Sequence, residues 1–417
     1  MADPVVALVI FLFTYVLISL RRVGKHSLDR PAVALLGGML MILFGVVSWQ
    51  QAFAAIELGV IFLLLGLMMI VACLELCGFF DLVSLVLIKL SKTRLDFLIL
   101  LMVTTAVLSA LILNDTVAFL FTPIVIKTCK LLRLNPVPFL IAEMVSINVG
   151  SVATAVGNPQ NAYVAEKGGI AYLEFAAVMI PLAAITLFLA IVLIYYLFRK
   201  EFAGAIEPPQ IDLKEYSLKN PALLTGIGIL LATVVGFFLS SALSVPLSLV
   251  AMAGGSFALF VFPLLGSVKP HAILAKVDWS ILLFFIGLFI VLQGFESSGL
   301  MGSFTDYFQK ASNGAVLSTP WLVFFAALLA NLISNVPAVL LVSPLILASG
   351  QREPWLVLAA GSTLSGNATI VGAAANVIVV QEASHMGVEI PTKQFMMAGV
   401  PIAVVTLLVT IAYFLLL

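Results

Sequence analysis

The sequence contains little charge and few cysteines, and both scarcities exclude whole classes of protein. Charged residues make up only 10% of its 417 residues, whereas soluble surfaces carry about 25–35%. Hydrophobic residues make up 63% and the mean hydropathy is +1.22, so we expect an all-α polytopic membrane protein. The three cysteines, Cys73, Cys77 and Cys129, lie in apolar segments, so neither disulfides nor a metal site is predicted.

The short motifs of common enzymes are also missing. The sequence has no His-Glu-x-x-His zinc motif, no glycine-rich phosphate loop and no Gly-x-Ser-x-Gly elbow. We therefore predict no enzyme activity, no cofactor and no nucleic-acid partner. Any dependence on ATP would require a separate ATPase subunit, and a homodimeric assembly is left open.

Ten apolar runs have the length of a membrane span, which is about 20 residues. They cover residues 5–20, 31–48, 57–74, 138–165, 172–198, 221–240, 246–265, 279–297, 354–380 and 395–417. The first run lacks a basic segment before it and an Ala-x-Ala-like site after it, so we interpret it as a retained span rather than a signal peptide.

Two further segments, 95–133 and 319–349, are interrupted by polar residues at mid-length. In the first, only Val117 to Ile126 separates Asn114-Asp115-Thr116 from Lys127, and ten helical residues rise about 15 Å, half of a ~30 Å hydrocarbon core. In the second, Ser334-Asn335-Val336-Pro337 makes the break. Both segments are predicted to be re-entrant hairpins whose tips are covered by protein or line a cavity.

Basic residues set the expected orientation. If the loop 21–25 is cytoplasmic and the runs alternate, all of the 20 lysines and arginines fall inside except Lys167, Lys310 and Arg352. Hairpin 95–133 then opens to the cytoplasm, hairpin 319–349 opens to the outside, and both termini lie outside. The linker 199–220 is cytoplasmic, in a prokaryotic cytoplasmic membrane.

The chain carries an internal repeat. A shift of 221 superposes Glu57 on Asp278, Asn114 on Asn335 and Pro123 on Pro344, and a shift of 215 superposes Thr154 on Thr369 and Asn161 on Asn376. Because the two halves have opposite predicted orientation, residues 1–198 and 221–417 form an inverted-topology repeat, each half with five spans and one hairpin.

Small and polar residues interrupt one span of each half, 138–165 and 354–380. Glycines there permit a broken helix, and Pro159 suits the first turn of the restarted helix. Two hairpin tips and two breaks should meet at the midplane and form one polar site. The breaks contribute Ser151, Asn158 and Asn367 to the predicted substrate site.

These motifs resemble those of the ion transporter superfamily, most closely the arsenite-efflux permeases and related anion permeases. The resemblance rests on Asn-Asp-Thr at 114–116, Val-Gly-Asn-Pro-Gln-Asn at 156–161, Leu-Ile-Ser-Asn-Val-Pro-Ala at 332–338 and the run from Gly366 to Asn376. It implies a transport domain that moves against a scaffold, and proton-coupled extrusion of arsenite or antimonite. The resemblance also implies which residues bind the substrate. They are Asn114, Asp115, Thr116, Ser334 and Asn335 at the tips, and Thr154 and Thr369 in the interrupted spans.

Asp115 is the acidic group at one tip, and its counterpart in the second half is Val336. A buried carboxyl can exchange a proton, and it would repel a dianion, so we expect Asp115 to couple protons to the export of a neutral hydroxide. Alternatively, Asp115 caps the following helix. Glu143 is either a second proton carrier or a satisfied structural carboxylate, and Asn114 and Asn335 either bind solute or only close the tips.

Other transport functions stay open at this stage. They are a sodium- or proton-coupled anion or dicarboxylate permease, a cation–proton antiporter of the same superfamily, and a channel.

Overall fold

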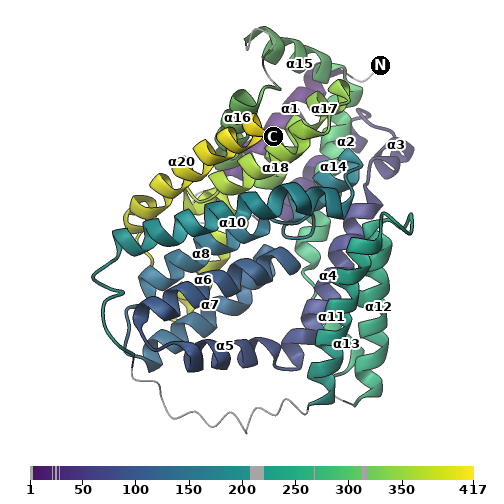
Figure 1. The fold of residues 1–417 in the computed structure, drawn as a ribbon. Helices are drawn as coiled ribbons and strands as arrows, with labels where there is room; N and C mark the ends of the chain where they lie inside the picture. The colour runs from purple at the N-terminus through teal and green to yellow at the C-terminus, as the bar shows by residue number, and fades with distance from the viewer. Residues whose placement is uncertain are drawn as a thin grey trace.

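The computed structural model describes residues 3–20, 22–23, 26–27, 29–206, 220–266, 268–311, 315 and 317–417 (Figure 1). Most of the predicted linker, 207–219, therefore lies outside the described residues. The described strands, β1 (Arg22–Val23) and β2 (His26–Ser27), pair antiparallel with Arg22 opposite Ser27. The rest of the described regular structure is helical.

The first half contains ten described helices. They are α1 (Pro4–Leu20), α2 (Arg30–Leu43), α3 (Trp49–Ala54), α4 (Leu58–Leu76), α5 (Phe79–Leu90), α6 (Arg94–Leu111), α7 (Asn114–Leu131), α8 (Pro136–Ser151), α9 (Pro159–Gly168) and α10 (Tyr172–Leu197).

The second half repeats this series. It contains α11 (Pro221–Leu239), α12 (Leu247–Leu264), α13 (Pro270–Ala275), α14 (Trp279–Ser297), α15 (Leu300–Ala311), α16 (Thr319–Ile333), α17 (Asn335–Ser349), α18 (Glu353–Ser365), the 3-10 helix η1 (Ile370–Gly372), α19 (Ala374–His385) and α20 (Thr392–Leu416).

The helix bounds confirm the repeat. Adding 221 to 49–54, 58–76 and 79–90 gives 270–275, 279–297 and 300–311, which are the bounds of α13, α14 and α15. The hairpins α6–α7 and α16–α17 and the broken pairs α8–α9 and α18–α19 also correspond. The predicted hairpins 95–133 and 319–349 are confirmed, as are the two interrupted spans.

Span lengths differ from the sequence expectation. Within the described residues, seven helices are long and apolar enough to cross a membrane, and one of them, α6, is a hairpin arm. The predicted span 31–48 is too long: α2 ends at Leu43, Gly45 turns the chain with φ +69°, and a capping box between Ser48 and Gln51 starts α3. The short helices α3, α5, α13 and α15 were not predicted, because each is shorter than the apolar run of about 20 residues that indicates a membrane span.

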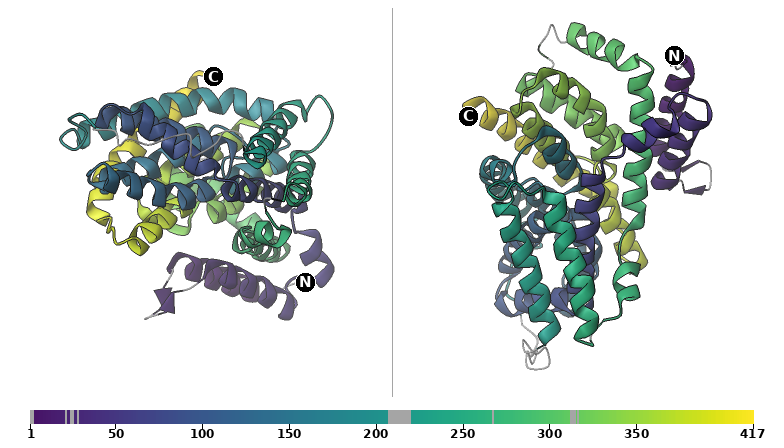
Figure 2. Two further views of the ribbon diagram at one scale, coloured as in Figure 1. Left: turned by 90° about the horizontal axis from the view of Figure 1, so that it is seen from below. Right: turned by 90° about the vertical axis from the view of Figure 1, so that its right-hand side faces the viewer.

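Six helices form a group that we call the scaffold: α1, α2, α4, α11, α12 and α14. Within it, α4 packs against α12 and α14 packs against α2, so each long helix contacts a helix of the other half. Glycines allow the close approach: a Cβ on Gly66 would lie 2.3 Å from the Ala251 carbonyl oxygen, and one on Gly287 would lie 2.4 Å from the Ala34 carbonyl carbon. The pairs α1–α2 and α11–α12 lie toward opposite ends of the molecule (Figures 1 and 2).

Helices α6 to α10 and helices α16 to α20 form a second group, which we call the hairpin core. Contacts follow the repeat: α6 packs on α8 and α16 on α18, while α7 packs on α19 and α17 on α9. The pair α10–α20 also crosses between the halves. The hairpin core therefore interleaves both repeats rather than placing them side by side.

The two hairpins open toward opposite ends of α10, a helix of 26 residues and about 39 Å. At its start, Glu174 pairs with Arg352, which caps α18 beside the base of α16–α17. Just beyond its end, the Glu201 carbonyl accepts from Arg94, the first residue of α6. Figure 1 likewise shows the matched helices α5 and α15 at opposite ends. This opposition is the arrangement that an inverted repeat requires.

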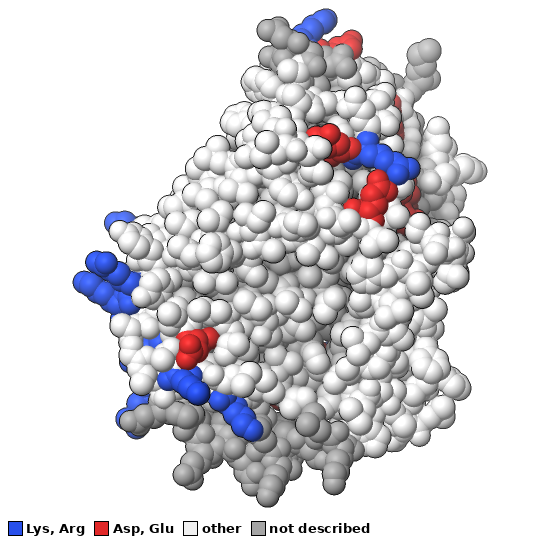
Figure 3. Space-filling model, in the orientation of Figure 1, with Lys and Arg blue, Asp and Glu red and all other residues white. Residues whose placement is uncertain are grey.

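Charge is confined to the ends of the molecule on the face that Figure 3 shows. Lys and Arg gather toward the lower end, near α5–α7 in Figure 1, and the area between the ends is mostly uncharged. Such an apolar belt fits burial in lipid.

Filling the contact at Gly66 tests the scaffold packing. We expect Gly66→Ala to lower the free energy of unfolding by about 1–3 kcal/mol, because the new methyl group meets backbone of α12 that cannot move aside. Thermal unfolding in detergent measures the effect. Gly228→Ala in α11 is the matched control, since a Cβ there meets nothing within 4 Å. Equal stability of the two variants would contradict the packing described.

Candidate functional site: two hairpin tips and two broken helices

The first tip lies between α6 and α7. Ile112 is extended (φ −135°, ψ 166°), so the chain leaves the first arm at Leu111 and re-enters a helix at Asn114. The Asn114 N–H donates to the Gly157 carbonyl oxygen at 2.9 Å, and the Asn114 Oδ1 accepts from the Asp115 N–H at 2.9 Å. The tip is therefore attached to the first broken helix through its backbone.

The second tip turns more sharply. Ser334 has φ +77°, a conformation unusual for a residue other than glycine, and α17 begins at the next residue. With its amide oriented to satisfy its neighbours, Asn335 donates to the carbonyl oxygens of Gly372 (2.9 Å) and Ser362 (3.0 Å) and accepts from Gln160 Nε2 (3.2 Å). This asparagine thus contacts the broken helices of both halves.

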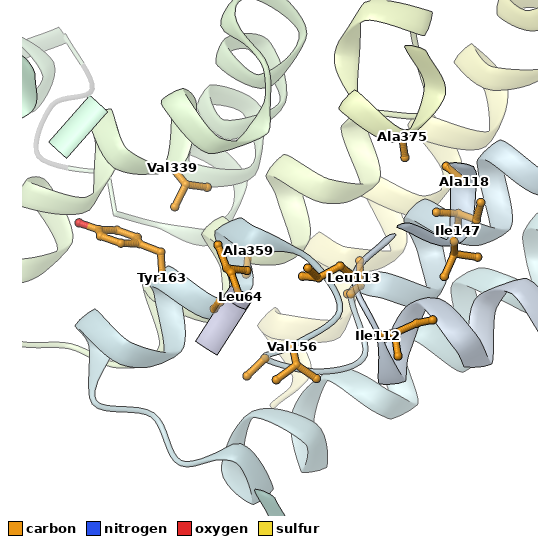
Figure 4. Close-up of a cluster of buried hydrophobic side chains, with 14 of the residues drawn as sticks. Leu64, Ile112, Leu113, Ala118, Ile147, Val156, Tyr163, Val339, Ala359 and Ala375 are labelled. Carbon is orange, nitrogen blue, oxygen red and sulfur yellow. The ribbon is translucent and has the colours of Figure 1, made fainter. Parts of the chain in front are cut away.

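The two tips converge. Asn114 bonds Gly157 and Asn335 bonds Gln160, so both reach the same four-residue stretch of the first break. Apolar side chains from both halves surround this region: Figure 4 shows Leu113 and Val156 of the first half in one cluster with Val339 and Ala359 of the second. The predicted meeting of Asn114 and Asn335 at one polar centre therefore agrees with the geometry.

Matched asparagines close the two breaks. Asn161 Nδ2 donates to the carbonyl oxygens of Ser151 (2.9 Å) and Thr154 (3.0 Å). Asn376 Nδ2 donates to those of Gly366 (2.8 Å) and Thr369 (3.2 Å), the residues related by the shift of 215. Neither asparagine was among the predicted site residues, although their coincidence in the repeat was the available signal.

A buried network of amides and hydroxyls joins the halves between the breaks. Asn148 Nδ2 donates to Asn367 Oδ1 (3.0 Å) and Asn376 Oδ1 (2.9 Å). Asn158 Nδ2 donates to Ser151 Oγ (3.1 Å) and Thr363 Oγ1 (3.3 Å). The predicted residues Ser151, Asn158 and Asn367 therefore bond one another or their neighbours inside the protein. Two atoms of this network, Asn148 Oδ1 and Asn367 Nδ2, are buried and have no hydrogen-bond partner.

The predicted threonines have different surroundings. Thr154 donates to the Ala110 carbonyl oxygen, and Thr369 donates to Asn331 Oδ1 at 2.9 Å. Because residues 110 and 331 are related by the shift of 221, each hydroxyl ties a broken helix to the first arm of its own hairpin. Thr116 is half-buried in the first turn of α7.

Asp115 is buried at the first tip. Its side chain is 9% exposed, and its Oδ1 has no hydrogen-bond partner. No side chain caps α7 at Leu113, which gives the capping alternative no support. Two charged residues from the scaffold act on this carboxyl electrostatically, Arg30 of α2 and Asp278 at the start of α14.

Arg30 is a residue of the site that sequence reasoning missed. It was assigned to the cytoplasmic side with the basic loop, but it is half-buried, begins α2, and its Nη1 donates to Ser334 Oγ at 3.3 Å. A signal existed: adding 221 to 30 gives Ala251, which lies inside α12 against Gly66. Its repeat position is therefore within a helix.

Glu143 lies away from the tips. Its side chain is 0% exposed, Oε1 accepts from Thr122 Oγ1 at 3.2 Å, and Oε2 has no partner. Thr122 is eight residues beyond Asn114 in α7, which is about 12 Å along the helix. A fully buried carboxylate with one neutral donor would be costly if ionised, so the satisfied structural alternative gains no support.

This arrangement defines a class of protein: a secondary membrane transporter with an inverted repeat and a polar centre built from hairpin tips and broken helices. The chain belongs to the citrate transporter family, whose sequence model matches residues 15–360.

Relatives and a solved structure agree with that class. The chain is 31% identical to an uncharacterized transporter of Mycobacterium bovis, over 98% of this chain and 97% of that one. It is 27% identical to the silicon efflux transporter LSI3 of Oryza sativa subsp. japonica over 85% of both. It is 25% identical to a Dictyostelium discoideum transporter named arsB, over 97% and 91%. The fold resembles that of the Alcanivorax borkumensis YdaH transporter, with a TM-score of 0.58 and 15% identity over 98% and 96%.

Removing the amide that closes a break tests the site architecture. We expect Asn161→Leu to leave the Ser151 carbonyl unpaired and to lower the free energy of unfolding by about 1–3 kcal/mol, while the Thr154 carbonyl keeps the Gly157 N–H as a donor. Thermal unfolding in detergent measures this. Asn135→Leu is the control, because Asn135 caps α8 at an exposed position, and we expect it to cost only about 1 kcal/mol. An equal loss would contradict the bridging role of Asn161.

Proposed function

We propose that this chain is a secondary active transporter that extrudes arsenite or antimonite from the cytoplasm by proton antiport, through alternating access. One observation carries the proposal: the buried carboxyl of Asp115 lies at the first tip, beside a centre whose other described polar groups are amides, hydroxyls and the Arg30 guanidinium. Such a centre can hydrogen-bond a neutral hydroxide such as arsenous acid. The carboxyl can carry the proton that moves the other way.

The relatives support a hydroxylated solute. One is named for silicon efflux, and dissolved silicon, like trivalent arsenic, is a small neutral hydroxide near neutral pH. Another is named arsB. In this proposal the hairpin tips and the breaks bind the solute together. The tips contribute Asn114, Asp115, Thr116, Ser334 and Asn335, and the breaks contribute Ser151, Thr154, Asn158, Asn367 and Thr369.

The proposal includes a location and a division of the chain. Residues 1–198 and 221–417 are the two repeats, joined by a cytoplasmic linker, 199–220, in a prokaryotic cytoplasmic membrane with both termini outside. Exchanging one proton for a neutral solute moves one charge, so the membrane potential contributes about 2.3 kcal/mol per 100 mV.

A second candidate is a proton- or sodium-coupled anion permease. The description of the family as citrate transporters favours it, and so does the Arg30 guanidinium at the second tip. Uptake of labelled citrate into proteoliposomes, with and without sodium, tests this alternative.

Growth on arsenite tests the proposed substrate. We expect the full chain to restore growth of a host that lacks its own arsenite exporter, because export lowers the internal concentration. The Asp115→Asn variant, expressed to the same level in the membrane, is the control and should not restore it. Normal membrane expression without rescue by the unaltered chain would favour the anion permease.

Proton coupling is tested separately at the two buried carboxyls. In inverted vesicles, we expect Asp115→Asn to abolish arsenite uptake driven by a proton gradient, a loss of at least about tenfold, since the amide cannot exchange a proton. Glu143→Gln should retain coupling if Asp115 is the sole carrier and lose it if Glu143 is a second one. Gradient-driven uptake by Asp115→Asn at the wild-type rate would refute the proposed role of Asp115.

A further inference from the structure

Arg30 and Asp115 belong to different parts of the molecule. Arg30 is the first residue of α2, a scaffold helix that packs on α14, whereas Asp115 lies in the first turn of α7 in the hairpin core. Between them, Ser334 at the second tip accepts a hydrogen bond from Arg30 Nη1 at 3.3 Å. One side chain of the scaffold is therefore bonded to the second tip. Because the two tips converge on residues 157–160, its guanidinium charge is also placed to act on Asp115 at the first tip.

We propose that Arg30 is the positioning residue that couples the protonation of Asp115 to the attachment of the scaffold to the hairpin tips. When Asp115 is ionised, its charge attracts the guanidinium and holds α2 against the tips. When Asp115 is protonated, that attraction disappears, and Arg30 keeps only its hydrogen bond to Ser334. The hairpin core is then less strongly held against the scaffold. This inference rests on the proposed role of Asp115 as the proton-coupling group.

The electrostatics around Arg30 favour such a switch. Arg30 is half-buried, and Asp115 is the acidic residue whose charge acts on it. Asp115 in turn interacts with Arg30 and with Asp278, which is exposed at the start of α14. The two charges that act on Asp115 both come from scaffold helices, so a relative displacement of the two bodies changes the cost of ionising it.

The test is the pH at which the Asp115 carboxyl is half-protonated, measured on the purified full chain by infrared difference spectroscopy. The Asp115→Asn variant assigns the carboxyl band. We expect Arg30→Gln to move the midpoint to higher pH by about one to three units, because the ionised carboxyl loses a cationic neighbour. Arg30→Lys keeps the positive charge, so its midpoint should lie close to that of the unaltered chain. This readout needs no transported substrate.

The functional arm uses proteoliposomes with arsenite as the probe. We expect Arg30→Gln to reduce the arsenite accumulation driven by a proton gradient by at least about tenfold, and to reduce the exchange of labelled for unlabelled arsenite much less. Arg352→Gln is the matched control, since Arg352 pairs with Glu174 at an exposed position away from the tips, and it should behave as the unaltered chain.

The possible failures are distinguishable. If Arg30→Gln leaves the midpoint unchanged while Asp115→Asn abolishes coupling, this inference is overturned and the proposed function stands. If Asp115→Asn keeps coupling, the proposed function fails. Should Arg30→Gln not yield folded protein, the neutral double variant Arg30→Gln with Asp115→Asn is expected to recover it, since no unpaired buried charge remains. A double variant that is no better folded overturns the charge link.

Discussion

The structure depends on pairing the backbone groups that broken helices expose inside an apolar environment. An unpaired carbonyl there costs several kcal/mol, so a break in mid-membrane needs a dedicated donor. Asn161 and Asn376 supply it, each with one amide group that bridges two carbonyls across its break. The carbonyls at the breaks are therefore paired close to where the hairpin tips approach. The polar centre follows from that approach.

Most polar groups of this centre occur in repeat-related pairs, one in each half, but two charged residues have no charged counterpart. The closing amides and the hydroxyls of Thr154 and Thr369 obey the repeat, so they support the architecture of both halves alike. Asp115 has Val336 as its counterpart, and Arg30 has Ala251. Because the first half alone carries both charges, the two halves present different electrostatic surroundings to the centre. A fully symmetric centre would lack this difference.

Much of the fold could be predicted because its signals are local or periodic. The first hairpin followed from an apolar run of ten residues after the polar break, Val117 to Ile126, which is too short to cross alone. The repeat followed from Asn and Pro residues in one register, and neither signal depends on packing. Which hydroxyls face solute could not be predicted. The hydroxyls of Thr154 and Ser151 donate to the Ala110 and Asn148 carbonyls, partners that depend on three-dimensional packing and that composition does not give.

Arg30 illustrates the limit of counting charges. The positive-inside rule assigns a basic residue to a side by its distance along the chain from a span, and Arg30 follows a basic loop closely. Depth in the membrane depends instead on where the helix begins relative to its packing partner. The repeat contains that information, since the counterpart position packs against the middle of α4 at Gly66. A basic residue whose repeat-related position lies inside a helix is therefore more useful as a candidate for a buried functional charge than as an indicator of the cytoplasmic side. Arg30 meets that criterion, and it is hydrogen-bonded to Ser334 at the second tip.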